Sequence, residues 1–145
     1  FTNCEFINCT LEAPFISHTS FKEVAFQECT LLGLQFEYCS DFLFEVSFDS
    51  CILRVCSFFK MNLKNSKFKD SKIIDVDFSN AILTGVKFEN CDLSKSIFDA
   101  TNLEKTDFST AIHFSIDPEN NKLSKTKFSN ENLSGLLNKY NLDII

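Results

Sequence analysis

The sequence predicts an all-β solenoid, in which the chain winds in stacked coils around a narrow apolar core. Large apolar residues recur at every fifth position, a spacing that fits neither a helix nor a simple strand. A small or medium-sized residue without charge stands two places before nearly all of them. When the 145 residues are folded at about 20 residues per coil, like residues also stack on like, as a repeat architecture requires.

The five-residue period runs through two stretches of the chain in different frames. The first stretch contains Phe1, Phe6, Leu11, Ile16, Phe21, Phe26, Leu31 and Phe36. The second contains Leu43, Phe48, Leu53, Phe58, Leu63, Phe68, Ile73, Phe78, Leu83, Phe88, Leu93, Phe98, Leu103 and Phe108. The frame slips by two residues at 37–43, where we expect a small bulge or short loop. Phe42 and Phe44 flank an inward Leu43 there, so at least one of them should face outward, either without a role or as a partner contact.

Stacking the coils produces four columns of side chains, one for each wall. Phe6, Phe26, Phe48, Phe68, Phe88 and Phe108 form one column, and Ile16, Phe36, Phe58, Phe78 and Phe98 form the opposite one. The third column is aliphatic, and the fourth changes from Phe to Leu at Leu43. At an inter-strand spacing of about 4.8 Å, the Phe rings of neighbouring coils would be in contact and would stabilise the stack.

Several of the five-residue units resemble the pentapeptide-repeat family, whose consensus is A-(D/N)-L-x-x. The best matches are CDLSK at 91–95, TNLEK at 101–105, VDFSN at 76–80 and TDFST at 106–110. The resemblance covers residues 1–115 and implies a right-handed quadrilateral parallel β-helix with one unit per wall. The chain would then make about 5.5 coils.

Residues 116–145 should leave the coil through a turn at Pro118. Ser129 is a good helix N-cap, and we expect a short capping helix at about 130–140. The residues expected to cover the open end of the coil are Leu133, Leu136, Leu137 and Tyr140 on one helix face, followed by the apolar tail Leu142, Ile144 and Ile145. The family resemblance implies a homodimer through this end, and a monomer with a closed cap is the alternative.

The seven cysteines follow the repeat rather than a ligand or disulfide pattern. Cys4, Cys9, Cys29, Cys51, Cys56 and Cys91 stand at the small inward position, and Cys39 takes the corresponding place at the slip. Cysteine therefore acts as a small hydrophobe, and reduced thiols are typical of a cytoplasmic protein. We expect no metal and no cofactor.

The sequence offers little material for catalysis. There are two histidines, His18 and His113, and the period places His113 in a core column. The sequence contains none of the nucleotide-binding, hydrolase or metalloprotease motifs sought. A rod with a filled core also lacks a deep pocket for a paired acid and base. We therefore predict that the chain is not an enzyme.

Charge and exposed apolar residues leave the outer walls as the functional surface. A net charge of −6 argues against direct binding to nucleic acid or to an anionic membrane, and no apolar run is long enough to span one. The candidate acidic partner face contains Glu28, Asp49, Asp70, Glu89 and Asp107, interrupted by Lys67, Lys69 and Lys87. Another wall presents Leu32, Ile52, Val55, Ile74 and Ile112, which either mark a contact site or simply favour strands.

These surfaces lead to two hypotheses about function. The favoured one is a non-enzymatic interaction module on a rigid acidic solenoid, with a protein partner whose identity the sequence does not give. The alternative follows from the resemblance to Qnr-type quinolone-resistance members of the family, which are bacterial, mimic duplex DNA and bind DNA gyrase. On that reading the chain is a DNA mimic that binds a type II topoisomerase.

Overall fold

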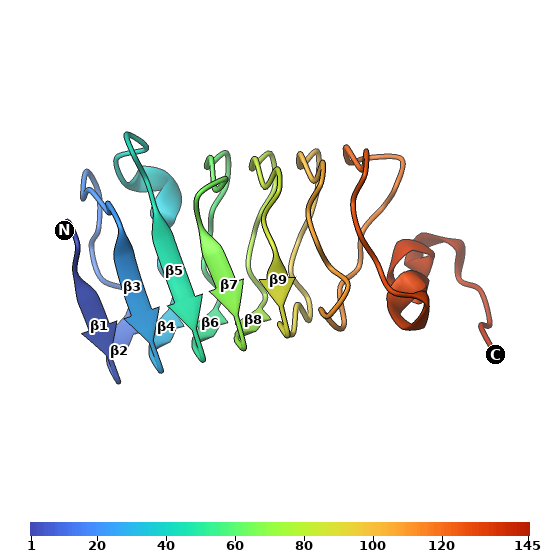
Figure 1. Cartoon of the computed structure of the whole chain (residues 1–145), viewed down its shortest axis with the longest axis horizontal. Helices are drawn as coiled ribbons and strands as arrows, with labels where there is room; N and C mark the ends of the chain where they lie inside the picture. The colour runs from blue at the N-terminus through green and yellow to red at the C-terminus, as the bar shows by residue number, and fades with distance from the viewer.

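The computed structural model describes all residues 1–145 and shows a parallel β-solenoid with its two termini at opposite ends of the stack (Figure 1). The fold class predicted from the five-residue period is therefore confirmed. The chain repeats the same path coil after coil, and the strands of successive coils pair in parallel.

Two parallel sheets form two of the walls. One sheet has the order β1-β3-β5-β7-β9 and the other has the order β2-β4-β6-β8. The first contains β1 (Glu5–Ile7), β3 (Val24–Gln27), β5 (Val46–Asp49), β7 (Lys67–Lys69) and β9 (Phe88–Glu89). The second contains β2 (Thr10–Glu12), β4 (Thr30–Leu32), β6 (Ile52–Arg54) and β8 (Lys72–Ile74). Single parallel bridges, such as Ser57 with Asp77 and Asn62 with Ile82, hold the other two walls.

The corners of the coil depend on residues in the left-handed backbone region. A residue with positive φ lies two places after most of the inward centres, as at Asn80, Asn90 and Lys95. Asn and Asp tolerate this conformation, whereas a β-branched residue such as Val55, with φ of 53°, is strained there. The corner conformation therefore recurs with the same period as the apolar centres, and together they produce the square path.

The core consists of stacked side chains whose columns meet in the middle of the coil. Phe58 stacks on Phe78 with ring centroids 5.5 Å apart and planes 8° apart. Phe58 also meets the edge of Phe68 from the opposite column, at 6.1 Å and 89°. Such edge-to-face and stacked pairs stabilise a core beyond the burial of their apolar area. Both kinds of contact recur along the rod.

The frame slip is present, but the prediction that Leu43 points inward is wrong. A 3-10 helix, η1 (Phe36–Tyr38), precedes the slip, and Phe26 then pairs with Phe48, two residues later than the repeat requires. Leu43 is 64% exposed and has a φ of 54°, while Phe44 is 4% exposed and fills the column. The ring of Phe44 packs against Phe21 at 6.2 Å, so the larger side chain occupies the core.

His113 shows the same kind of displacement, and its predicted place in a core column is wrong. Ala111 is buried as expected, but His113 is exposed with a φ of 60°. The next residue, Phe114, enters the core and packs on Phe108 with ring centroids 5.4 Å apart. His113 instead places its Nδ1 atom 3.1 Å from Asp92 Oδ1 on the surface.

The coil continues beyond the expected boundary at residue 115. Lys122 bridges to Asn102, and Lys127 bridges to Asp107. The ring of Phe128 stacks on Phe108 at 5.5 Å with planes 4° apart. Thr126 and Phe128 repeat the spacing of a small residue and an apolar centre, so the coil resumes after a loop that breaks the period.

All seven cysteines are free. Cys4 and Cys9 in the first coil are half-buried, and the five cysteines of the later coils are buried. Burial raises the pKa of the Cys51 thiol to about 11 and that of the Cys91 thiol to about 12. Thiols with such pKa values remain protonated at neutral pH and are weak nucleophiles and metal ligands. They fill core space beneath the larger side chains.

The adjacent residues Phe58 and Phe59 provide a test of the inward register. Phe58 is fully buried, whereas Phe59 is only half-buried and lies on the wall. We expect Phe58→Ala to lower the free energy of unfolding by about 3–5 kcal/mol because it leaves a cavity in a stacked column. Phe59→Ala should cost about 1 kcal/mol or less. Urea unfolding of both variants measures the difference, and equal losses would contradict the register.

Candidate interaction surfaces

The predicted acidic face lies on the wall formed by the sheet β1-β3-β5-β7-β9. Asp49 and Glu89 lie on β5 and β9, and Glu28 and Asp70 occupy left-handed corners beside this wall. Asp107 lies one coil further along and forms a parallel β-bridge with Lys87. The structure therefore brings all five predicted carboxylates to one side of the rod, spread over successive coils.

These carboxylates differ in their surroundings. Asp70 accepts a hydrogen bond from Asn90 at 3.0 Å, and Glu89 lies 4.0 Å from the Lys87 ammonium group. Partial burial tends to raise the pKa of Asp107, but hydrogen bonds from Ser109 and the charges of Lys87 and Lys127 hold it below its usual value. The carboxylate of Asp107 therefore stays charged over the whole neutral range.

The second candidate surface is the sheet β2-β4-β6-β8. Leu32, Ile52 and Val55 are 39%, 36% and 59% exposed there. Leu32 is in register with Arg54, which in turn is in register with Ile74, so these side chains lie on neighbouring strands. Ile112, also exposed, bridges to Asp92 further along the same wall. We call Leu32, Ile52, Val55 and Ile74 the apolar wall patch.

The C-terminal end contains two short 3-10 helices where one α-helix was expected at about 130–140. They are η2 (Asn130–Leu136) and η3 (Asn138–Tyr140). The backbone N–H of Ser129 donates to Asn132 Oδ1 at 2.9 Å, so a capping contact is present. Gly135 lies against Phe114, where an added Cβ would come within 2.5 Å of the ring. This close approach requires glycine and sets how η2 covers the coil.

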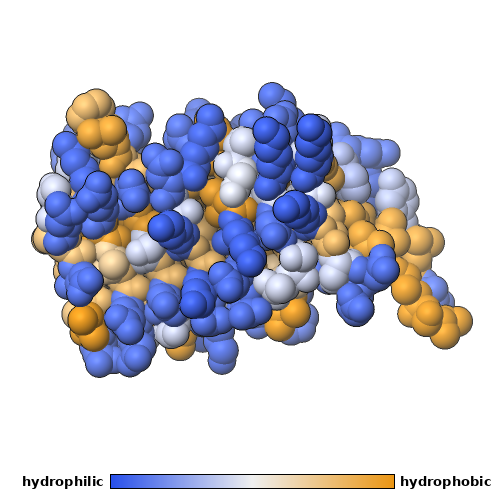
Figure 2. Space-filling view, in the orientation of Figure 1, coloured by the Kyte–Doolittle hydropathy of each residue, from blue (hydrophilic) through white to orange (hydrophobic).

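The residues predicted to form the cap or dimer contact do not all cover the coil. Leu136 and Leu137 are half-buried, and Leu136 packs against the core. Leu133 and Tyr140 are exposed, and so are the tail residues Leu142, Ile144 and Ile145. Figure 2 shows this tail as a hydrophobic extension beyond the end of the rod. The expectation that the tail closes the coil is therefore wrong, because it extends away from the core.

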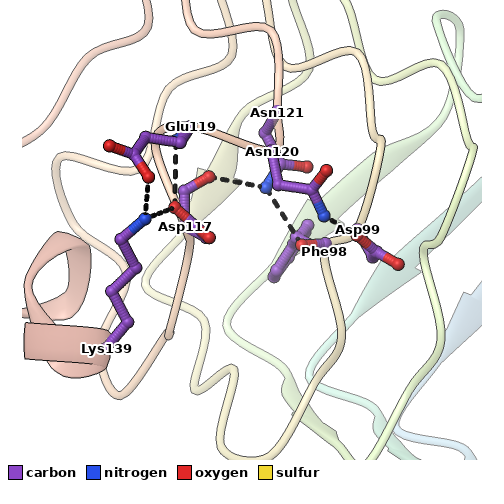
Figure 3. Close-up of polar contacts among 7 residues, drawn as sticks. All are labelled: Phe98, Asp99, Asp117, Glu119, Asn120, Asn121 and Lys139. Atoms are coloured by element: carbon purple, nitrogen blue, oxygen red, sulfur yellow. Dashed lines mark hydrogen bonds and ion pairs between the residues drawn. The ribbon is translucent and has the colours of Figure 1, made fainter.

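Polar side chains hold the cap, and the sequence analysis did not identify them. Asn132 Nδ2 donates to the carbonyl oxygens of Phe108 and Ala111 at 2.8 and 3.0 Å, which satisfies the last coil. Asn121 Nδ2 donates to the carbonyl oxygens of Phe98 and Asp117 at 3.0 and 2.9 Å (Figure 3). Asn121 takes the place that Thr101 holds one coil earlier, where the Thr101 hydroxyl donates to the carbonyl oxygen of Phe78 at 2.9 Å.

An ion-pair cluster links η3 to the loop that follows the coil. Lys139 Nζ lies 2.9 Å from Asp117 Oδ1 and also contacts Glu119 (Figure 3). The hydrogen bond from Lys139, together with the backbone N–H of Glu119, lowers the pKa of Asp117. The two carboxylates raise the pKa of Lys139 in return. The cluster fixes the cap to the rod over the pH range in which all its members are charged.

The structure contains no group of three or more His, Cys, Asp or Glu residues arranged to hold a metal ion. None of its helices has the length and hydrophobicity needed to cross a membrane.

The fold and its surfaces define a class of protein: a quadrilateral solenoid with a filled core and exposed outer walls. The sequence matches the family model for the pentapeptide repeat region over residues 1–78 and 42–111. The chain belongs to the pentapeptide repeat family. No curated protein matches it.

Solved structures align with this chain at low sequence identity. Full-length QnrB1, a plasmid-mediated fluoroquinolone resistance protein, aligns with a TM-score of 0.52 and 15% identity, covering 95% of this chain and 100% of QnrB1. A pentapeptide repeat protein from the thylakoid lumen of Arabidopsis thaliana aligns with a TM-score of 0.42 and 17% identity, covering 79% and 65%. Rfr23 from the cyanobacterium Cyanothece 51142 aligns with a TM-score of 0.34 and 15% identity, covering 88% and 89%. At these identities the likeness concerns the fold.

The Lys139 cluster predicts a pH-dependent contribution to stability. Asp117 has a lowered pKa in the folded chain, so its contribution is complete above its unfolded pKa of about 3.9 and is lost as the pH falls through the folded value. We expect Lys139→Met to lower the melting temperature near pH 7 and to have little effect near pH 2. Lys95→Met, which removes an exposed lysine without an ion pair, is the control. An effect of Lys139→Met that persists unchanged at low pH would contradict the ion-pair explanation.

Proposed function

We propose that this chain is a non-enzymatic interaction module whose rigid walls bind a protein partner. The observation that carries the proposal is the apolar wall patch, where Leu32 and Ile52 are exposed on a regular sheet, Val55 is exposed at its edge and Ile74 is half-buried. Clustered exposed apolar residues on a folded protein are typical of contact surfaces. The stacked coils hold the patch rigid, so little conformational entropy is lost when a partner binds. The free thiols, five of the seven of them buried, support a reducing, cytoplasmic location for the module.

A double variant tests the apolar wall patch without disturbing the fold. Leu32→Asp places a carboxylate in register with Arg54, and Val55→Asp replaces a β-branched residue at a left-handed corner. Phe15→Asp with Ile97→Asp is the matched control, since both residues are exposed on a different wall. Affinity capture from the native cell should retain the same partner with the wild type and the control and lose it with the patch variant. Equal retention by all three would contradict the patch as the contact.

The second candidate function is binding to a type II topoisomerase as a mimic of duplex DNA. The specific observation in its favour is that Asp49, Asp70, Glu89 and Asp107 lie along one side of the rod on successive coils. A row of carboxylates can enter a groove lined by Lys and Arg and can accelerate association. The likeness to QnrB1 concerns the fold and adds no residue-level support.

Supercoiling by bacterial DNA gyrase, with and without a quinolone, tests the mimic. We expect the wild-type chain to change gyrase activity at micromolar concentration. The variant Asp49→Asn, Asp70→Asn, Glu89→Gln should lose this effect because it removes three charges while keeping side-chain shape. The control Asp41→Asn, Asp75→Asn, Glu104→Gln removes three charges from other walls. Absence of any wild-type effect, or an equal loss in both variants, would rule out the acidic-face mechanism.

We also propose that the chain forms a homodimer through its C-terminal end. Leu142 and Ile144 are 58% and 59% exposed at the end of the rod, and exposed apolar tails of this kind are buried when two copies meet. Light scattering of the wild type and of Leu142→Asp/Ile144→Asp measures the mass directly. A wild-type monomer at high concentration would exclude this dimer.

A further inference from the structure

A groove of about 660 Å³ crosses the sheet β1-β3-β5-β7-β9 at the level of β5, β7 and β9. Its lining is mostly hydrophilic, and only Phe68 and Val86 contribute apolar side chains, both of them buried. Hydrophilic side chains cover the middle of this face in the space-filling view (Figure 2). Gly85 occupies a left-handed corner of the coil. The same corner carries a lysine in the following coils, at Lys105 and Lys125, so the absence of a side chain at Gly85 leaves the groove open.

The groove is basic although the chain as a whole carries a net charge of −6. It is lined by Lys64, Lys67, Lys69 and Lys87 against Glu45 and Glu89. The groove contains one ion pair, in which Lys87 Nζ lies 4.0 Å from Glu89 Oε2, a long distance for such a contact. Lys64, Lys67 and Lys69 therefore make no ion pair, although Lys69 lies in register between Asp49 and Glu89.

Two of these lysines lie in register on neighbouring coils. Phe68 and Phe88 are paired on neighbouring strands, and Lys67 and Lys87 are the residues directly before them. The two lysine side chains therefore project from the same wall, one coil apart. Like charges directly opposite one another on adjacent strands destabilise a sheet. An anion between the two ammonium groups would remove this repulsion.

Ser66 supplies a second, independent observation at the same groove. Ser66 is 4% exposed and lines the groove, and its hydroxyl has no hydrogen-bond partner. The equivalent hydroxyls of Thr106 and Thr126 donate to the carbonyl oxygens of Leu83 and Leu103, which lie on the preceding coil. The corresponding carbonyl for Ser66 belongs to Leu43, which the frame slip displaces. A buried hydroxyl without a partner is costly unless a ligand or water satisfies it.

We propose that this groove is a binding site for a compact oligophosphate. Lys64, Lys67, Lys69 and Lys87 would surround the phosphoryl groups, and Ser66 would donate a hydrogen bond at the base of the groove. Lysine ammonium groups bind phosphate oxygens as mobile point charges, whereas planar carboxylates favour the fork of arginine. The site lies on a different sheet from the apolar wall patch and does not rest on the function proposed for that patch.

The lining also restricts the class of ligand. No exposed aromatic side chain lines the groove, so a nucleobase would find no ring on which to stack. The small apolar area similarly offers little to a ligand with a hydrophobic body. The ligand class is therefore one of clustered phosphoryl groups, either an inorganic oligophosphate or a phosphorylated polyol, rather than a nucleotide.

Calorimetric titration at low ionic strength tests the site with three probes: tripolyphosphate, inositol hexakisphosphate and ADP. We expect one site for tripolyphosphate or inositol hexakisphosphate, a rise in melting temperature on binding, and weaker binding of ADP. The relative affinities of the first two probes distinguish the inorganic source from the polyol source. Absence of binding by both, or tighter binding of ADP, would overturn the proposal.

Matched charge variants separate a site from general attraction. Lys67→Gln/Lys87→Gln should weaken binding by about tenfold or more, because it removes two of the four groove charges. Lys60→Gln/Lys95→Gln removes two exposed lysines from corners away from the groove and should change the affinity by less than about threefold. Equal weakening by both pairs would show that binding is non-specific and would overturn the site.

The Ser66 hydroxyl has its own readout. Ser66→Ala should weaken oligophosphate binding without lowering the melting temperature of the free chain, since the hydroxyl has no partner to lose. An unchanged affinity, or a clear loss of stability, would overturn the assignment of Ser66 to the site.

Discussion

The contact between the two aromatic columns is the constraint on which the rest of the structure depends. Within these columns the Phe rings stack on the ring one coil away, and from Phe36 onward they also meet the edge of a ring in the opposite column. Phe36 and Phe58 stack at 4.6 Å and 4°, and Phe48 meets Phe58 at 6.2 Å and 71°. Because these contacts recur from one coil to the next, they favour a constant path of five residues between centres. The left-handed corners and the outward walls follow from that spacing.

This constraint explains where the chain accepts extra residues and what those residues do. At the slip and again near His113, the aromatic residue one place later fills the column, and the residue before it turns outward in the left-handed region. The period of five could not decide between Leu43 and Phe44, because both are apolar and adjacent. The structure decides through ring contacts, since Phe44 meets both Phe21 and Phe36 at about 6 Å.

The sequence predicted the fold class, the inward cysteines and the wall carrying the acidic residues, because these depend on a strict period. It could not predict the cap, which depends on contacts between segments that share no period. Asn121, Asn132 and Lys139 each bind groups far away in sequence, and no local pattern marks them. The lysine groove was missed for a related reason. Lys64 belongs to a neighbouring wall, and the turn of the chain between the two walls brings it into the same groove as Lys67.

The position of the groove links the two kinds of recognition that the wall offers. Lys67, Lys69 and Lys87 interrupt the row formed by Asp49, Asp70, Glu89 and Asp107, so the wall without a ligand presents mixed charge. An oligophosphate in the groove would reverse the local sign and join the carboxylates into a continuous acidic surface. Its binding and the binding of a basic partner to the same wall would then each favour the other by the same coupling free energy. With Lys67 and Lys87 neutralised, the oligophosphate would bind weakly and the partner would meet a wall that is acidic from the start.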